Sequence, residues 1–178
     1  MNLYDFLSKY SIEDILNLEQ EDLQFVAIKK LFKSRNFSHQ DFLFLILVNS
    51  LVCYQLSGKG ELYWQEFSRY FSSNKINDST SLKEKFKNFL KNSKNNKRLL
   101  KAKLTRVDRI FNFYDDFCDK YSTYYKDMRS LNFDLASMMN QRIDAKTIVF
   151  AVKMFGYGAR IVFGYIEIFP KSNPTPLQ

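Results

Sequence analysis

The chain has 178 residues, of which 46% are hydrophobic and 17% aromatic, and it carries a formal net charge of +8. This composition excludes a disordered chain, and the longest apolar run, Phe42 to Val48, is too short to span a membrane. Two cysteines and one histidine, His39, make neither a disulfide framework nor a metal centre. We therefore expect no cofactor, no metal ion, no membrane association, and a reducing, cytoplasmic location.

Helix-breaking residues are scarce, since the chain holds only five glycines and three prolines. Apolar residues recur at helical spacing, and the sequence contains no convincing strand and no internal repeat. The spacings Ser11 to Asp14 and Ser38 to Asp41 are typical of helix starts. The sequence thus predicts an all-α fold in one domain spanning 1–178. The predicted helices span 3–10, 11–18, 20–35, 42–56, 61–71, 82–92, 99–121, 124–139 and 144–163, with a polar linker at 72–81 and a flexible, lysine-rich hinge at 92–97.

Two lysines interrupt the apolar helix predicted at 144–163. Asp144 can act as its N-cap, which places Lys146 in the first turn, where the helix dipole disfavours a cation. Lys153 follows two turns later on the same face, with Phe150 between the two lysines. A lysine held there against apolar walls loses basicity, and a neutral amine is what a Schiff-base nucleophile requires. The alternative is that both lysines extend to solvent from the edge of the helix.

The positive charge is concentrated in one segment. Residues 75–109 hold twelve Lys or Arg against three acidic residues, a balance of +9, whereas the rest holds fifteen against sixteen. Such a concentration indicates a polyanion-binding face. The alternative is that a lysine- and asparagine-rich composition reflects coding bias in an AT-rich genome.

Three sequence blocks carry a resemblance to a known family. They are EDLQF at 21–25, LVCYQLSGKGELYWQEF at 51–67 and AKTIVFAVKM at 145–154. In their order and spacing the chain resembles the archaeal GO glycosylase family, which comprises 8-oxoguanine DNA glycosylase/lyases of the helix-hairpin-helix superfamily. The resemblance implies a helical bundle of two lobes with the active site between them. It also implies a helix-hairpin-helix at about 124–163, although the turn there lacks the usual glycines.

The resemblance further implies a reaction and a partner. Lys146 matches the nucleophile that attacks the sugar C1′ of the damaged nucleotide. Release of the base leaves an imine on the lysine, and β-elimination can then cut the strand on the 3′ side. The expected partner is duplex DNA containing 8-oxoguanine, with single-stranded DNA as a second candidate. The chain is expected to act as a monomer associated with the nucleoid.

Five further residues match the pocket for the flipped base: Gln24, Cys53, Trp64, Phe150 and Lys153. A base must leave the duplex before its glycosidic bond can be reached. Trp64 and Phe150 can stack on such a base, and Gln24 offers both a donor and an acceptor. Cys53 stands where we expect a serine, and its thiol is the weaker donor. The alternatives are a core position for Trp64 and a surface position for Gln24.

The chain departs from the family at its C-terminus. The family continues with a proline-rich segment whose aspartate assists catalysis, and then a further helix. Here the segment NPTPLQ at 173–178 places Gln178 where that aspartate belongs, with Glu167 as the nearest carboxylate. We therefore expect a shortened or frameshifted homologue, or an incomplete gene product. Losing a catalytic acid or base costs on the order of 10²–10⁴ in rate. The missing aspartate leaves open, as an alternative function, a catalytically impaired DNA- or lesion-binding homologue. The +9 segment alone leaves open a basic helical nucleic-acid-binding or scaffold protein unrelated to repair.

Overall fold

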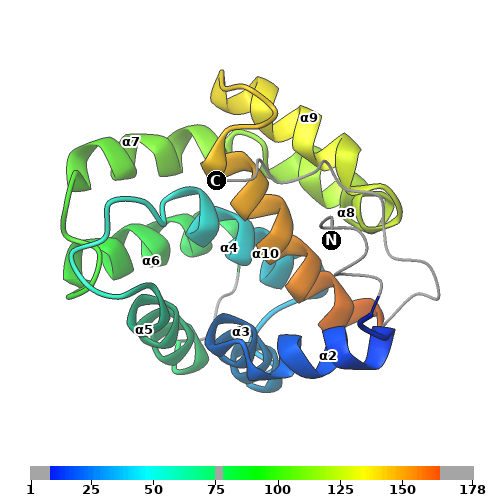
Figure 1. The fold of residues 1–178 in the computed structure, drawn as a ribbon. Coiled ribbons are helices and arrows are strands. Elements are labelled where there is room, and N and C mark those ends of the chain that lie inside the picture. The colour runs from blue at the N-terminus through cyan, green and yellow to red at the C-terminus, as the bar shows by residue number, and fades with distance from the viewer. Residues whose placement is uncertain (1–8, 75–77, 165–178) are drawn as a thin grey trace.

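The computed structural model describes residues 9–74 and 78–164. The helix predicted at 3–10 and the segment containing Glu167 and Gln178 therefore lie outside the described residues. All elements in the described part are α-helices, which confirms the all-α prediction (Figure 1). These helices are α2 (Ile12–Glu21), α3 (Leu23–Lys33), α4 (His39–Leu51), α5 (Gly60–Ser72), α6 (Ser79–Asn92), α7 (Leu100–Phe111), α8 (Tyr114–Lys126), α9 (Met128–Met139) and α10 (Lys146–Phe163).

The core is organised around α4 and α10, which cross near the centre of the molecule (Figure 1). Every residue of α4 from Phe42 onward is buried. Gly158 of α10 allows the two helices to approach closely, because a Cβ there would lie 2.5 Å from Ile46 Cδ1 and 3.0 Å from Leu43 Cδ2. The remaining helices surround this pair, with α2, α3 and α5 on one side and α8 and α9 on another (Figure 1).

Several helices are shorter than their hydrophobic pattern predicts. The helix predicted at 20–35 begins at Leu23, because Asp22 leaves the helical conformation and its side chain accepts a hydrogen bond from Gln24 N, 2.8 Å away. The helix predicted at 42–56 ends at Leu51, whose carbonyl accepts a 2.9 Å hydrogen bond from Arg106. Apolar spacing does not reveal such ends, since they depend on individual hydrogen bonds, some of them from distant parts of the chain.

The helix predicted at 99–121 is divided into α7 and α8, with a break at Asn112 and Phe113. Phe113, at the break, and Phe117, in the first turn of α8, are both buried. Similarly, the helix predicted at 124–139 is α9 alone, since Tyr124 belongs to α8 and the side chain of Asp127 caps α9 by accepting from Arg129 N.

The turn after α6, predicted as a flexible hinge, is held by many hydrogen bonds. Ser93 and Asn96 are buried, and the Glu66 carboxylate accepts hydrogen bonds from Ser93 Oγ and Lys94 N at 2.8 and 2.7 Å. None of the described helices is both long and apolar enough to cross a membrane.

Candidate active site

The turn between α9 and α10 brings Lys146 to the first position of a buried helix. Asn140 ends α9 in the left-handed conformation, with φ 51°, and Thr147 Oγ1 donates a 2.9 Å hydrogen bond back to Gln141 Oε1. The prediction that Asp144 caps α10 is wrong. Its carboxylate instead accepts two hydrogen bonds from Arg142, at 2.8 and 2.7 Å, so that α10 begins without a side-chain cap.

Lys146 is exposed, and the expectation that apolar walls surround its side chain is wrong. Among the described residues, no side chain forms a hydrogen bond or ion pair with its amine. Within the described part of the chain, no side chain caps the first backbone N–H groups of α10 either. An accessible amine at an uncapped helix N-terminus can meet a phosphate-bearing ligand, because N–H groups and the helix dipole both favour an anion there.

Lys153 is also exposed, but it has partners. Its Nζ lies 3.5 Å from Asp22 Oδ2 and 4.9 Å from the centre of the Tyr157 ring. Asp22 in turn accepts a 2.8 Å hydrogen bond from the Tyr157 hydroxyl. Partial burial by itself would raise the pKa of Asp22, but the hydrogen bonds from Tyr157 and Gln24 N and the nearby ammonium hold that pKa below its usual value. Lys153 is therefore fixed against an ionised carboxylate.

Gln24 lies in the first turn of α3 and is half-buried. A Cβ on Gly60 would lie 3.6 Å from Gln24 Nε2, so the amide of Gln24 stands next to the first residue of α5. Because Asp22 binds both the start of α3 and Lys153, the structure brings Gln24 and Lys153 to the same end of α3. Gln24 is thus neither fully exposed nor buried at this place.

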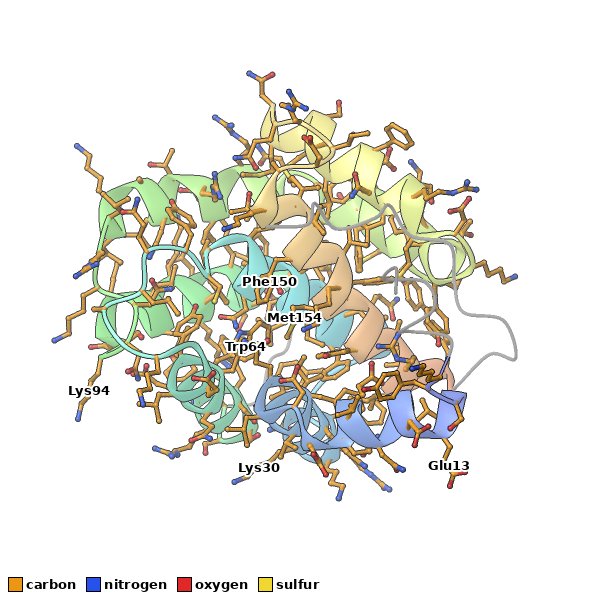
Figure 2. The ribbon with its side chains drawn as sticks, viewed as in Figure 1. Glu13, Lys30, Trp64, Lys94, Phe150 and Met154 are labelled. Atoms are coloured by element: carbon orange, nitrogen blue, oxygen red, sulfur yellow. The ribbon has the colours of Figure 1, made fainter. Side chains whose placement is uncertain are left out.

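Trp64 is completely buried on α5, and its ring meets that of Phe67 edge-on at 5.5 Å. Its indole N–H has no hydrogen-bond partner among the described residues. Cys53 is close by: burial raises the pKa of its thiol to about 11, opposed by the Trp64 indole and by the Lys103 ammonium. Figure 2 shows Trp64 and the half-buried Phe150 of α10 in the central part of the molecule. No face of the Trp64 ring is open, so stacking on a base requires neighbouring groups to move.

Lys103 is a buried cation that no motif in the sequence indicated. It is completely covered, donates a hydrogen bond to Asn96 Oδ1, and lies 4.8 Å from the centre of the Tyr54 ring. Burial lowers its pKa to about 8, although the Cys53 thiol acts in the opposite direction. The only sign of this in the sequence was the position of Lys103 on the apolar face of α7, three residues after Leu100 and four before Val107.

This pKa predicts a pH dependence of stability. The pKa of Lys103 is about 8 when folded and close to its ordinary value of 10.5 when unfolded. Between these values unfolding takes up a proton, so the free energy of unfolding rises with pH by up to about 1.4 kcal/mol per unit. The Cys53 thiol, whose pKa is raised from 9.0 to about 11, acts in the opposite direction above pH 9. The rise is therefore expected in the difference between the free energies of unfolding of wild type and a Lys103→Met variant, when urea unfolding of both is followed from pH 7.5 to 10. Parallel curves for the two proteins would contradict it.

Other features of the described region lie apart from these residues. Two surface cavities of about 360 and 450 Å³ lie away from the six candidate residues, one between α7, α8 and α9 and one at the end of α3. Within 9–74 and 78–164, no three His, Cys, Asp or Glu side chains are grouped so that they could hold a metal ion.

Comparison with known proteins gives the context of this arrangement. A family model described as AGOG: N-glycosylase/DNA lyase matches residues 4–177. An N-glycosylase/DNA lyase of Methanococcus maripaludis is 44% identical over 159 residues, covering 89% of this chain and 62% of the relative. A second, from Methanopyrus kandleri, is 36% identical over 180 residues, covering 100% of this chain and 72% of the relative. The chain thus spans under two thirds of the Methanococcus protein.

A solved structure is similar as well. The crystal structure of an 8-oxoguanosine-complexed 8-oxoguanine DNA glycosylase from Pyrobaculum aerophilum superposes with a TM-score of 0.76 at 26% identity, over 93% of this chain and 61% of that one. The chain therefore has the all-α fold of that glycosylase. The chain belongs to the AGOG family of N-glycosylase/DNA lyases, which confirms the resemblance drawn from the three sequence blocks.

Proposed function

We propose that this chain excises 8-oxoguanine from DNA as a glycosylase and AP lyase, with Lys146 as the nucleophile. The observation that carries the proposal is an exposed lysine, without a partner among the described side chains, at the uncapped first turn of α10 in a chain of the AGOG family. The names of the relatives favour an enzyme over a lesion-binding homologue without activity. Family membership also argues against a scaffold protein unrelated to repair.

The chemistry begins when the damaged nucleotide leaves the duplex. The Lys146 amine attacks C1′, the glycosidic bond breaks, and the base leaves with its bonding electrons and then takes up a proton. The nitrogen then loses its protons, and the C1′–O4′ bond breaks with O4′ taking up a proton, which opens the sugar ring and leaves an imine between C1′ and Lys146. This imine makes the C2′ proton acidic. Loss of that proton and of the 3′ phosphate completes β-elimination. The uncapped N–H groups at the start of α10 are suited to a phosphate next to the reacting sugar.

The other matched residues are assigned to the base. Gln24 would read a base edge with its amide, and Trp64 and Phe150 would supply stacking surfaces. Lys153 would contribute a cation whose position is fixed by Asp22. Cys53 would line the pocket beside Trp64. Because Trp64 is covered, the proposal requires the pocket to open when the base enters.

The remaining parts of the proposal concern organisation and partners. The single domain spanning 1–178 would consist of two lobes, with the site between the α9–α10 hairpin and the lobe formed by α3 and α5. The substrate would be duplex DNA containing 8-oxoguanine, with single-stranded DNA as a second candidate. The chain would act as a monomer in the cytoplasm, at the nucleoid.

The test is borohydride trapping on a duplex that contains one 8-oxoguanine. An imine between Lys146 and the sugar is reduced to a stable bond, so a protein–DNA adduct should appear only with the lesion duplex. An undamaged duplex of the same sequence is the control. If wild type binds the lesion duplex but yields neither adduct nor free base, the enzyme assignment is wrong.

A further inference from the structure

The turn between α6 and α7 carries a group of exposed positive charges. Lys94, Lys97 and Arg98 are exposed, and Figure 2 shows Lys94 projecting outward at the edge of the molecule. In the part of the chain that the structure describes, none of these three side chains is engaged in an ion pair. By contrast, Lys83 and Lys87 of the basic segment share one carboxylate, that of Asp108, at 2.8 and 2.7 Å. The segment at 75–109 therefore presents free cations at this turn.

This turn is joined to the segment that carries Cys53. The backbones meet where Asn95 O accepts hydrogen bonds from Ser57 N and Gly58 N, at 2.9 and 3.1 Å. Gly58 permits the contact, because a Cβ there would lie 2.1 Å from Asn95 Oδ1 and 2.9 Å from its Cγ. Further along, Asn96 Nδ2 donates to Val52 O at 3.3 Å. The exposed cations thus stand on a turn whose backbone is fixed against residues 52–58.

Two charged side chains, Glu66 and Lys103, form further hydrogen bonds to the turn. The Glu66 carboxylate accepts hydrogen bonds from Ser93 Oγ, Lys94 N and Asn95 Nδ2, at 2.8, 2.7 and 3.0 Å. Partial burial alone would raise the pKa of Glu66, but these donors hold it below its usual value, so the group stays ionised. From the other side, Lys103 donates to Asn96. Glu66 lies on α5, two residues after Trp64, so the same helix supports both the turn and the pocket.

We propose that the turn at 93–98 binds the phosphate backbone of DNA and that its bonds to residues 52–58 set the position of the strand relative to the base pocket. This inference rests on the proposed function, since it supplies the surface that such an enzyme needs beside its pocket. Exposed cations free of carboxylates attract phosphates. Contacts to phosphates fix the register of a protein on the duplex without reading sequence.

The binding half is tested with an undamaged duplex, so that it does not depend on base excision. For a Lys97→Ala/Arg98→Ala variant of the full chain, the affinity is measured by fluorescence anisotropy at several salt concentrations. Each cation lost that binds a phosphate should make the slope of log K against log salt shallower by about 0.9, so the double variant should change it by about 0.9 to 1.8. A Lys30→Ala/Lys33→Ala variant removes the same charge from exposed positions on α3 and should keep the wild-type slope. An unchanged slope in the first variant, or equal changes in both, overturns the proposal.

The second part of the proposal, that the turn sets the position of the strand relative to the base pocket, is tested by a kinetic measurement. Gly58→Ala should separate the two segments, and Ser57→Ala removes only the hydroxyl that accepts from Lys97 N at 2.9 Å. With the lesion duplex at saturation, we expect the single-turnover rate to fall, on the order of tenfold for Gly58→Ala, because small misplacements of reacting groups are costly. The salt slope should stay as in wild type. If Gly58→Ala does not fold, Ser57→Ala decides. A wild-type rate in every folded variant contradicts positioning, whereas absence of turnover in wild type itself counts against the proposed function alone.

Discussion

Replacing Lys146 with glutamine is expected to abolish the borohydride-trapped adduct and to slow base release by on the order of 10³-fold or more. The amide keeps the polarity of the side chain at nearly the same length but has no nucleophilic nitrogen. Lys146 is exposed, and its amine has no partner among the described side chains, so the variant should unfold at the wild-type urea concentration. The defect would therefore be chemical. Trapping and release of the base from the same lesion duplex measure it.

Lys153→Gln is the matched control, since this lysine lies two turns along on the same face of α10. The amine of Lys153 is paired with Asp22 and lies over the Tyr157 ring. The amine of Lys146, by contrast, has no partner among the described side chains. The variant should still form the adduct, with weaker binding to the lesion. An adduct that persists in Lys146→Gln and vanishes in Lys153→Gln would reverse the assignment of the nucleophile.

Trp64→Ala is expected to lower the free energy of unfolding by about 3–5 kcal/mol, because the ring is completely buried against Phe67 and the rest of the core. Urea unfolding measures this. A second substitution, Trp64→Leu, keeps an apolar side chain and should remain folded. If the ring stacks on the flipped base, Trp64→Leu should weaken binding to the lesion by about 1–3 kcal/mol, which is the usual contribution of such stacking.

Trp64→Phe supplies the comparison, since it keeps an aromatic face in a smaller ring. We expect it to bind lesion DNA more tightly than Trp64→Leu does. Equal affinity for both folded variants and wild type would mean that Trp64 serves only the core, which was the alternative drawn from the sequence.

Local interactions explain what could be predicted. The Ser11 and Asp14 capping box forms as expected, and Ser38 caps α4 by accepting from Asp41 N. A cap of this kind depends on residues three apart, and such information is present in the sequence. Asp144 shows the limit of this reasoning. Its carboxylate turns to Arg142, two residues away, so a stronger charged partner replaced the backbone donor that the cap prediction assumed.

The sequence predicted individual residues of the candidate site but not the contacts between them. That Asp22 would join Lys153, Tyr157 and the start of α3 depends on a contact across 135 positions of sequence. Burial of Lys103 could not be predicted either, because a lysine on an amphipathic helix ordinarily reaches solvent. Its position follows from the packing of α7 against the turn that carries Asn96.

The sequence by itself determined the helical class, the caps of α2 and α4, the family, and the place of Lys146 at the beginning of α10. These depend on spacing within about one turn or on matched blocks of residues. The tertiary structure alone decided which of the two lysines of α10 is left without a partner, that Trp64 is covered, and that free cations gather at the turn after α6. Exposure and pairing of a charge depend on what other segments place beside it, and neighbours so distant in sequence leave no local pattern.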